Sequence, residues 1–196
     1  MRVQPLFATP LVIDELAGAD AINAALAPQI LAKREADPGR ELSNRGGWQS
    51  NHDFGGWPGD EPRAIVRRAV ELASANCLRS DGAEPRWTVE AWANVGGPGA
   101  FNMPHIHGAT YWAAVYYVRV GEGDGGQLVL HDPRMPGLRM HAPALRFRNM
   151  GPELRAEVRP KEGLMVLFPA WLSHSVEPWH GTGERISVAM NIRAAS

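Results

Sequence analysis

Residues 102–107, Asn-Met-Pro-His-Ile-His, place two histidines two positions apart in the chain. In a β-strand, residues i and i+2 point to the same side, so the imidazoles of His105 and His107 are expected on one face. Imidazole nitrogen is a ligand for zinc, copper, iron and nickel. Pro104 and Gly108 flank the pair, which favours a strand end beside a turn, where a ligand can approach.

A metal site that takes two ligands from one strand needs a third ligand from elsewhere in the chain. His174 is the candidate, because it follows an apolar run and a proline in the segment 169–176, Pro-Ala-Trp-Leu-Ser-His-Ser-Val. We therefore predict that His105, His107 and His174 are the metal ligands and the catalytic residues. An ion held by His105 and His174 alone is the open alternative. The remaining histidines are interpreted as structural: His52, His131, His141 and His180.

The overall composition is that of a soluble globular protein. A net charge of −1 gives no electrostatic reason to expect nucleic acid or an anionic membrane as a partner. No run approaches the roughly 18 apolar residues that a membrane span needs. Cys77 is the only cysteine, so no intramolecular disulfide can form, which fits a reducing compartment. We expect a cytoplasmic protein.

The N-terminal part of the chain is expected to hold one strand and two helices. A strand is predicted within residues 7–16, where a proline favours the edge of a sheet. Alanine and leucine dominate residues 19–35, and apolar residues recur there at every fourth position, which predicts an amphipathic helix. A second helix is predicted over residues 61–79, with a proline in its first turn. The glycine-rich segment 43–52 is predicted to be a loop.

From Trp87 onward, short runs with strand character alternate with turn signals. These runs cover residues 87–95, 111–120, 127–130, 164–168 and 185–192. The segment 121–126, Gly-Glu-Gly-Asp-Gly-Gly, is predicted to be a hairpin-type turn between two strands. Such spacing is typical of an all-β sandwich or barrel. We expect a single domain, 1–196, in which residues 1–85 brace a β core formed by residues 86–196.

The last predicted strand alternates cleanly between two kinds of side chain. Its apolar face consists of Ile186, Val188 and Met190, and its polar, small face of Arg185, Ser187, Ala189 and Asn191. If the apolar face packs against the helices, Arg185 points inward, where an unpaired charge is costly. A guanidinium matches a carboxylate in two parallel hydrogen bonds, so a small-molecule carboxylate is the expected partner. The alternative is a surface Arg185 paired with Glu184.

The order of these features resembles the iron(II)/2-oxoglutarate-dependent oxygenases of the prolyl-hydroxylase-like superfamily. The features are the histidine pair, Val-Tyr-Tyr-Val at 115–118, Gly-Gly-Gln-Leu at 125–128, the distal His174 and Arg-x-Ser at 185–187. The chain is most similar to a bacterial and phage subfamily. The resemblance also covers the segments 46–50, 94–107 and 168–176. It implies a mainly β fold with N-terminal helices, a double-stranded β-helix or jelly roll related to cupins.

The resemblance also implies roles for individual residues. His105 and His174 match the two histidine ligands of the superfamily, whereas His107 stands where most members carry Asp or Glu. Arg185, with Ser187 nearby, matches the residues that hold the distal carboxylate of 2-oxoglutarate. Three further residues are assigned to the cofactor in the same way: Tyr117, where related hydroxylases place a phenol, and Asn94 and Asn102, where polar groups line the site.

The function implied is an Fe(II)/2-oxoglutarate-dependent dioxygenase that uses O2 to hydroxylate a small-molecule or peptide substrate and converts 2-oxoglutarate to succinate. Three histidines also match catalytic zinc sites, so the metal stays open between iron, zinc and nickel. One alternative is a three-histidine cupin-type enzyme that does not use 2-oxoglutarate, and another is a non-catalytic metabolite-binding jelly roll. Jelly rolls often pair through edge strands, so a homodimer is one expectation. The proline-rich, basic segment 131–161 is either a solvated connection or a lid that attracts an anionic substrate.

Overall fold

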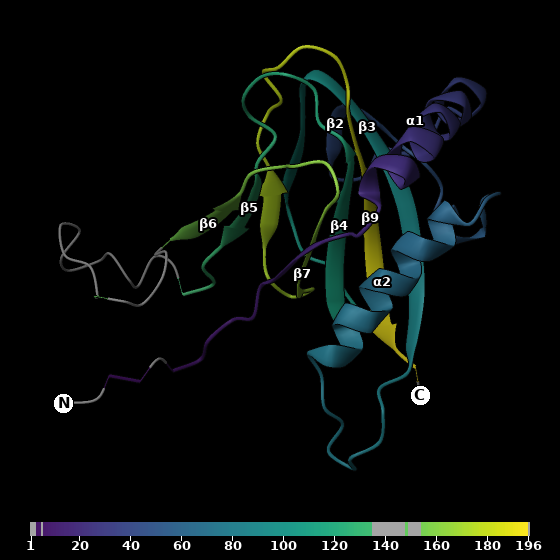
Figure 1. Ribbon diagram of the computed structural model, residues 1–196. Coiled ribbons are helices and arrows are strands. Elements are labelled where there is room, and N and C mark those ends of the chain that lie inside the picture. The colour runs from purple at the N-terminus through teal and green to yellow at the C-terminus, as the bar shows by residue number, and fades with distance from the viewer. Residues whose placement is uncertain (1–2, 5, 135–147, 149–153, 196) are drawn as a thin grey trace.

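The computed structural model describes residues 3–4, 6–134, 148 and 154–195, and within them the chain forms a curled antiparallel sheet with two main helices (Figure 1). The strands follow the spatial order β1-β7-β4-β9-β3-β8-β5-β6, and β2 pairs with β3 outside this path. Their bounds are β1 Val12–Glu15, β2 Asn44–Gln49, β3 Trp87–His105, β4 Trp112–Arg119, β5 Leu128–His131, β6 Arg155–Val158, β7 Leu164–Pro169, β8 His174–Val176 and β9 Arg185–Ala194. The prediction of a mainly β, jelly-roll-like fold is confirmed.

The long strand β3 belongs to both halves of the curled sheet. Its first part pairs with β9, from Trp87 opposite Ala194 to Gly96 opposite Arg185. Its last part pairs with β8, and the register shifts before His105. Between these two parts the strand leaves one partner and joins another. Because of this change of partner, His105 at the end of β3 lines the same cavity as Arg185 and Ser187 of β9.

The helices α1 (Ala19–Ala36) and α2 (Glu61–Ala75) lie on one side of β3, β4 and β9 (Figure 1). Both were predicted, although α2 ends four residues earlier than expected. The fourfold apolar spacing in α1 places Leu26 and Ile30 in the same buried cluster as Ile186 of β9. The apolar face of β9 therefore packs towards the helices, as the alternation of its side chains predicts.

The opening strand is shorter than predicted, but it lies at the edge of the sheet next to β7, as expected. The prediction of a loop over residues 43–52 is wrong, because β2 occupies Asn44–Gln49 and pairs with β3. The glycines that argued against regular structure allow this close pairing. A Cβ at Gly47 would lie 3.0 Å from the carbonyl oxygen of Val95, so glycine suits a strand whose backbone is approached this closely.

The prediction that residues 121–126 join two paired strands is also wrong. β4 pairs with β7 and β9, whereas β5 pairs with β6 and β8, so this segment crosses between the two halves of the sheet. Its glycines permit close packing on another loop, because a Cβ at Gly123 would lie 2.1 Å from the Cα of Gly181. The short strands β6 and β8 were not predicted. The predicted lid or connection, 131–161, lies mostly outside the described residues, apart from β6 and its flanks.

Truncating the helix face that packs on the sheet should destabilise the protein. Leu26 is 0% exposed and Leu78 is 100% exposed. We expect Leu26→Ala to lower the free energy of unfolding by about 2–5 kcal/mol, because it removes buried contacts and leaves a cavity. Leu78→Ala, the matched control, should change it by less than about 0.5 kcal/mol. Urea denaturation measures both, and equal effects would contradict the packing described.

Candidate metal centre and cofactor cavity

A cavity of about 540 Å³ opens inside the curl of the sheet. Its size falls in the range of small-molecule binding sites. The predicted site residues all line it: Asn94, Asn102, His105, His107, Tyr117, His174, Arg185 and Ser187. Among the described residues that line the cavity there is no aspartate or glutamate. The cationic groups there therefore have no carboxylate from the cavity wall to pair with.

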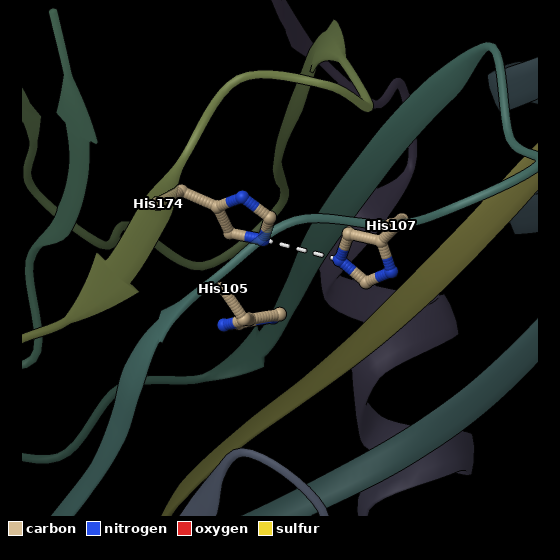
Figure 2. A group of neighbouring side chains, drawn as sticks. All are labelled: His105, His107 and His174. Atoms are coloured by element: carbon tan, nitrogen blue, oxygen red, sulfur yellow. Dashed lines mark hydrogen bonds between the residues drawn. The ribbon is translucent and has the colours of Figure 1, made fainter. Parts of the chain in front are cut away.

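Three histidines converge at one part of this cavity (Figure 2). His105 is the last residue of β3 and stands directly opposite His174, the first residue of β8. His107 follows the end of β3, and its backbone N–H donates to the carbonyl of Ala170 at 3.0 Å. Strand pairing thus positions two of the rings, and a single backbone bond to the segment between β7 and β8 holds the third.

The three rings are close enough for their nitrogens to meet at one point. The ring centroids of His105 and His174 lie 4.2 Å apart, and those of His107 and His174 lie 5.0 Å apart. The Nε2 atoms of His107 and His174 are separated by 3.1 Å, and one ligand atom from each of the three residues lies within 4.8 Å of the others. A single metal ion can be held by donors at this spacing.

Two of the rings are oriented by carbonyl groups of their own segments. Nδ1 of His105 lies 2.7 Å from the carbonyl oxygen of Met103, and Nδ1 of His174 lies 2.9 Å from that of Leu172. Each Nδ1–H can therefore donate to a carbonyl, which leaves the Nε2 lone pair as the metal ligand; Nε2 of His105 also lies 3.5 Å from the hydroxyl of Ser43. This arrangement is typical of metal-binding histidines.

Burial keeps all three imidazoles uncharged at neutral pH. Burial and, after it, the nearby charge of a protonated His105 lower the pKa of His107 to about 4 and that of His174 to about 3. Burial also lowers the pKa of His105, against the opposing effect of its bond to the Met103 carbonyl. Neutral imidazoles are the form that binds metal, so the site is ready for an ion without losing protons first.

Arg185 lies in the same cavity and is 7% exposed. Its Nε has no hydrogen-bond partner among the described residues, and burial lowers the pKa of its guanidinium, an effect that Tyr117 opposes. The neighbouring Glu184 pairs with Arg34 instead, so the surface pair between Arg185 and Glu184 is not formed. A buried cation of this kind requires an anionic partner, and the cavity is where one can bind.

A row of polar side chains crosses four neighbouring strands beside Arg185. In register across the sheet stand Gln49 of β2, Asn94 of β3, Ser187 of β9 and Tyr117 of β4. All four line the cavity. Asn102 also lines it and donates through Nδ2 to the hydroxyl of Ser43 at 3.1 Å. The predicted cofactor residues are thus brought together on one wall, and Gln49 joins them.

The sequence interpretation missed Gln49 and His52 as cavity residues. Asn191, which the alternation of β9 placed on the same face as Arg185, also lines the cavity. His52 was interpreted as structural, but its ring stacks on Trp92 at 4.5 Å and faces the cavity wall. No local signal placed it there, since it comes from the chain between β2 and the next helix.

Of the other histidines assigned a structural role, His131 and His180 do not line the cavity. Nε2 of His131 lies 2.9 Å from the hydroxyl of Ser175, and the backbone N–H of His180 donates to Asp124 at 2.9 Å. His141 lies outside the described residues. Trp48 donates to the carbonyl of Asp37 at 2.9 Å and packs against the helix-side cluster, so it does not face a substrate.

Residues 90–191, more than half of the chain, match the family model described as "Putative 2OG-Fe(II) oxygenase". The chain belongs to this family. Its members use Fe(II), 2-oxoglutarate and O2, together with a substrate. This membership decides against the two alternatives, a metalloenzyme that does not use 2-oxoglutarate and a non-catalytic jelly roll. Both the three-imidazole donor set and the unpaired guanidinium in the cavity fit these cofactors.

Solved structures share the fold of this oxygenase at low sequence identity. A prolyl-4-hydroxylase from Pseudomonas putida is 20% identical with a TM-score of 0.65, and the match covers 95% of this chain and 93% of that one. A prolyl hydroxylase from Trichoplax adhaerens is 16% identical with a TM-score of 0.64 over 93% and 83%. HygX from Streptomyces hygroscopicus, solved with nickel, 2-oxoglutarate and hygromycin B, is 12% identical with a TM-score of 0.61 over 94% and 83%.

The curated protein sequences contain no match to the oxygenase. Within the described part of the chain, no helix is both long enough and apolar enough to cross a membrane.

Removing a histidine from the cluster should abolish tight metal binding by the oxygenase. We expect His105→Ala and His174→Ala each to weaken Fe(II) or Ni²⁺ binding by roughly 100-fold or more, which exceeds the usual effect of losing an outer partner. His180→Ala, at an exposed position, is the control and should bind as the parent does. Anaerobic titration calorimetry measures the affinities. Unchanged binding in both variants would disprove the metal centre.

Proposed function

We propose that this oxygenase hydroxylates a small-molecule or peptide substrate, with His105, His107 and His174 holding the iron and Arg185 pairing with the distal carboxylate of 2-oxoglutarate. One observation carries the proposal: a buried, unpaired guanidinium shares a cavity with three convergent neutral imidazoles. When bound, iron and 2-oxoglutarate would supply the chemistry with O2 as the oxidant: one oxygen atom enters succinate as 2-oxoglutarate loses CO2, and the other replaces a C–H hydrogen of the substrate as a hydroxyl group.

The protein's own contribution is to bind and orient the cofactor and to limit water. Arg185 offers a fork of parallel donors to a carboxylate, and the hydroxyls of Ser187 and Tyr117 stand in register beside it. Burial raises the pKa of the Tyr117 phenol, an effect that Arg185 opposes, so the phenol keeps its proton and acts as a donor. Phe168 and Leu128 give the same cavity an apolar wall.

The three-histidine donor set changes the charge at the metal. A site with two histidines and one carboxylate places one negative charge on the ion, whereas three neutral imidazoles place none. The ion then keeps one more positive charge, and its attraction for the two carboxylates of 2-oxoglutarate is stronger. Arg185 adds to this attraction from the same cavity. We infer that the cofactor contributes the negative charge that the protein's ligands lack.

The entrance to the cavity supports an approach of the substrate over an apolar rim. Leu42, Met103 and Ile106 line the cavity and remain largely exposed. Exposed apolar side chains gathered at a cavity are typical of binding surfaces. Two structures that share this fold are a prolyl-4-hydroxylase and HygX, which was solved with hygromycin B bound, so the fold is compatible with a peptide or a small-molecule substrate. A substrate with an apolar segment fits this rim.

Replacing the buried guanidinium should remove 2-oxoglutarate turnover while leaving the metal site intact. We expect Arg185→Met to weaken 2-oxoglutarate binding by roughly 100-fold, since it deletes a charged, two-point contact. Arg185→Lys should weaken 2-oxoglutarate binding less than Arg185→Met does, because lysine keeps the positive charge. Anaerobic addition of 2-oxoglutarate to the Fe(II) protein, followed by its metal-to-ligand charge-transfer band, gives the affinity, and succinate release gives the turnover.

Arg63→Met is the matched control, because Arg63 lies in an exposed pair with Asp60 on α2. It should bind 2-oxoglutarate as the parent does. Parent-like affinity in Arg185→Met, or a parent protein that shows neither the band nor succinate, would refute the proposed function.

A further inference from the structure

Gln49, the last residue of β2, is a buried residue whose side-chain nitrogen meets no acceptor in the described part of the chain. Its side chain lines the cavity, the residue is 2% exposed, and its Nε2 has no hydrogen-bond partner among the described residues. An amide that leaves water without a new hydrogen bond costs free energy. Buried amides are nearly always satisfied in folded proteins, so an unpaired one in a binding cavity indicates a group that meets its partner when a ligand binds.

The backbone holds Gln49 firmly in this place. Gln49 pairs with Asn94 of β3, and its carbonyl accepts the N–H of Arg40 at 2.8 Å. The next residue, Ser50, donates its N–H to the carbonyl of Ala93 at 2.9 Å. Neighbouring side chains in a strand point to opposite faces, and Trp48 packs against the helix-side core. The amide of Gln49 is therefore directed into the cavity by strand geometry.

The neighbours of Gln49 are hydrogen-bond donors suited to carboxylate oxygens. Asn94, Ser187 and Tyr117 continue the row that Gln49 begins, and Arg185 lies two residues before Ser187 on the same face of β9. No acidic side chain of the described chain lines the cavity. A donor amide among hydroxyls and a guanidinium, with no carboxylate on the described cavity wall to accept from them, is complementary to a dicarboxylate.

We propose that Gln49 is a further cofactor-binding residue, whose amide donates a hydrogen bond to a carboxylate oxygen of 2-oxoglutarate. The proposal rests on the proposed function of the cavity. Gln49 lies outside the segment that matches the family model, residues 90–191, so family membership does not assign it. β2 then contributes directly to the binding site, in addition to extending the sheet.

The test compares 2-oxoglutarate binding in the Ni²⁺-loaded parent, Gln49→Met and Gln49→Glu by anaerobic calorimetry. Methionine keeps the length of glutamine and removes its polar atoms. We expect Gln49→Met to weaken 2-oxoglutarate binding about tenfold, the effect of one hydrogen bond to a charged group. Gln49→Glu should weaken it further, because it adds a like charge. Ni²⁺ affinity should stay unchanged in both variants.

A second measurement separates binding from a structural role. The melting temperature of ligand-free Gln49→Met should equal or exceed that of the parent, because the variant no longer buries an unpaired amide. Gln127→Met is the control. Gln127 does not line the cavity, and its Nε2 donates to Oδ1 of Asp124 at 3.4 Å. Gln127→Met should therefore bind 2-oxoglutarate with the affinity of the parent.

Three results would overturn the assignment. Parent-like affinity in Gln49→Met would show that the amide makes no contact with 2-oxoglutarate, even if substrate turnover changed. A lower melting temperature of ligand-free Gln49→Met together with weaker binding would show that Gln49 supports the fold instead. A parent protein that does not bind 2-oxoglutarate would refute the proposed function as well, whereas binding by the parent with no effect of Gln49→Met refutes this assignment alone.

Discussion

One edge of β3 pairs first with β9 and then with β8, and this pairing fixes the geometry of the whole site. β3 runs beside β9 up to Gly96, opposite Arg185, and then beside β8 at His105, opposite His174. Backbone hydrogen bonds thus set both the distance between two histidines and the position of the guanidinium relative to them. Because strand pairing is rigid, the cavity keeps its donors in place before any ligand arrives.

This preorganisation leaves polar groups buried without partners in the ligand-free protein. The Nε of Arg185 and the Nε2 of Gln49 both lack hydrogen-bond partners among the described residues. Each costs stability until a ligand supplies the missing atom. The buried clusters on the helix side and within the sheet offset this cost. Apolar packing therefore stabilises both faces of the sheet, whereas the binding groups lie only inside the curl.

Periodicity in the sequence predicted the parts of the fold in which side chains alternate or recur strongly. The fourfold repeat predicted α1, and the twofold alternation of β9 correctly predicted which face meets the helices. His174 was joined to the histidine pair as a hypothesis from its residue type and sequence context, and the family resemblance supported it, because nothing local in the chain indicates that β8 pairs with β3. The structure brings them together as expected. Their roles as ligands remain predictions.

The failures have physical causes. β2 was missed because two glycines, which usually interrupt strands, here permit the close approach to Val95. The four-residue β6 and three-residue β8 are too short to show a periodic signal. Residues 121–126 were predicted to join two strands that pair with each other, but the flanking strands β4 and β5 each pair with strands farther along the chain. Gln49 was missed as a cavity residue because residues 43–52 were predicted to be a loop, and a residue in a loop has no defined face.

β9 constrains how the protein can change over evolutionary time. Its odd-numbered positions face the ligand chamber and its even-numbered positions fill the hydrophobic interior, from Arg185 and Ile186 onward. Insertion of one residue inside this strand would exchange the two sets, turning a guanidinium into the interior and isoleucine into the chamber. Length variation is therefore confined to the connections around the strand, and diversification within it is restricted to point replacements.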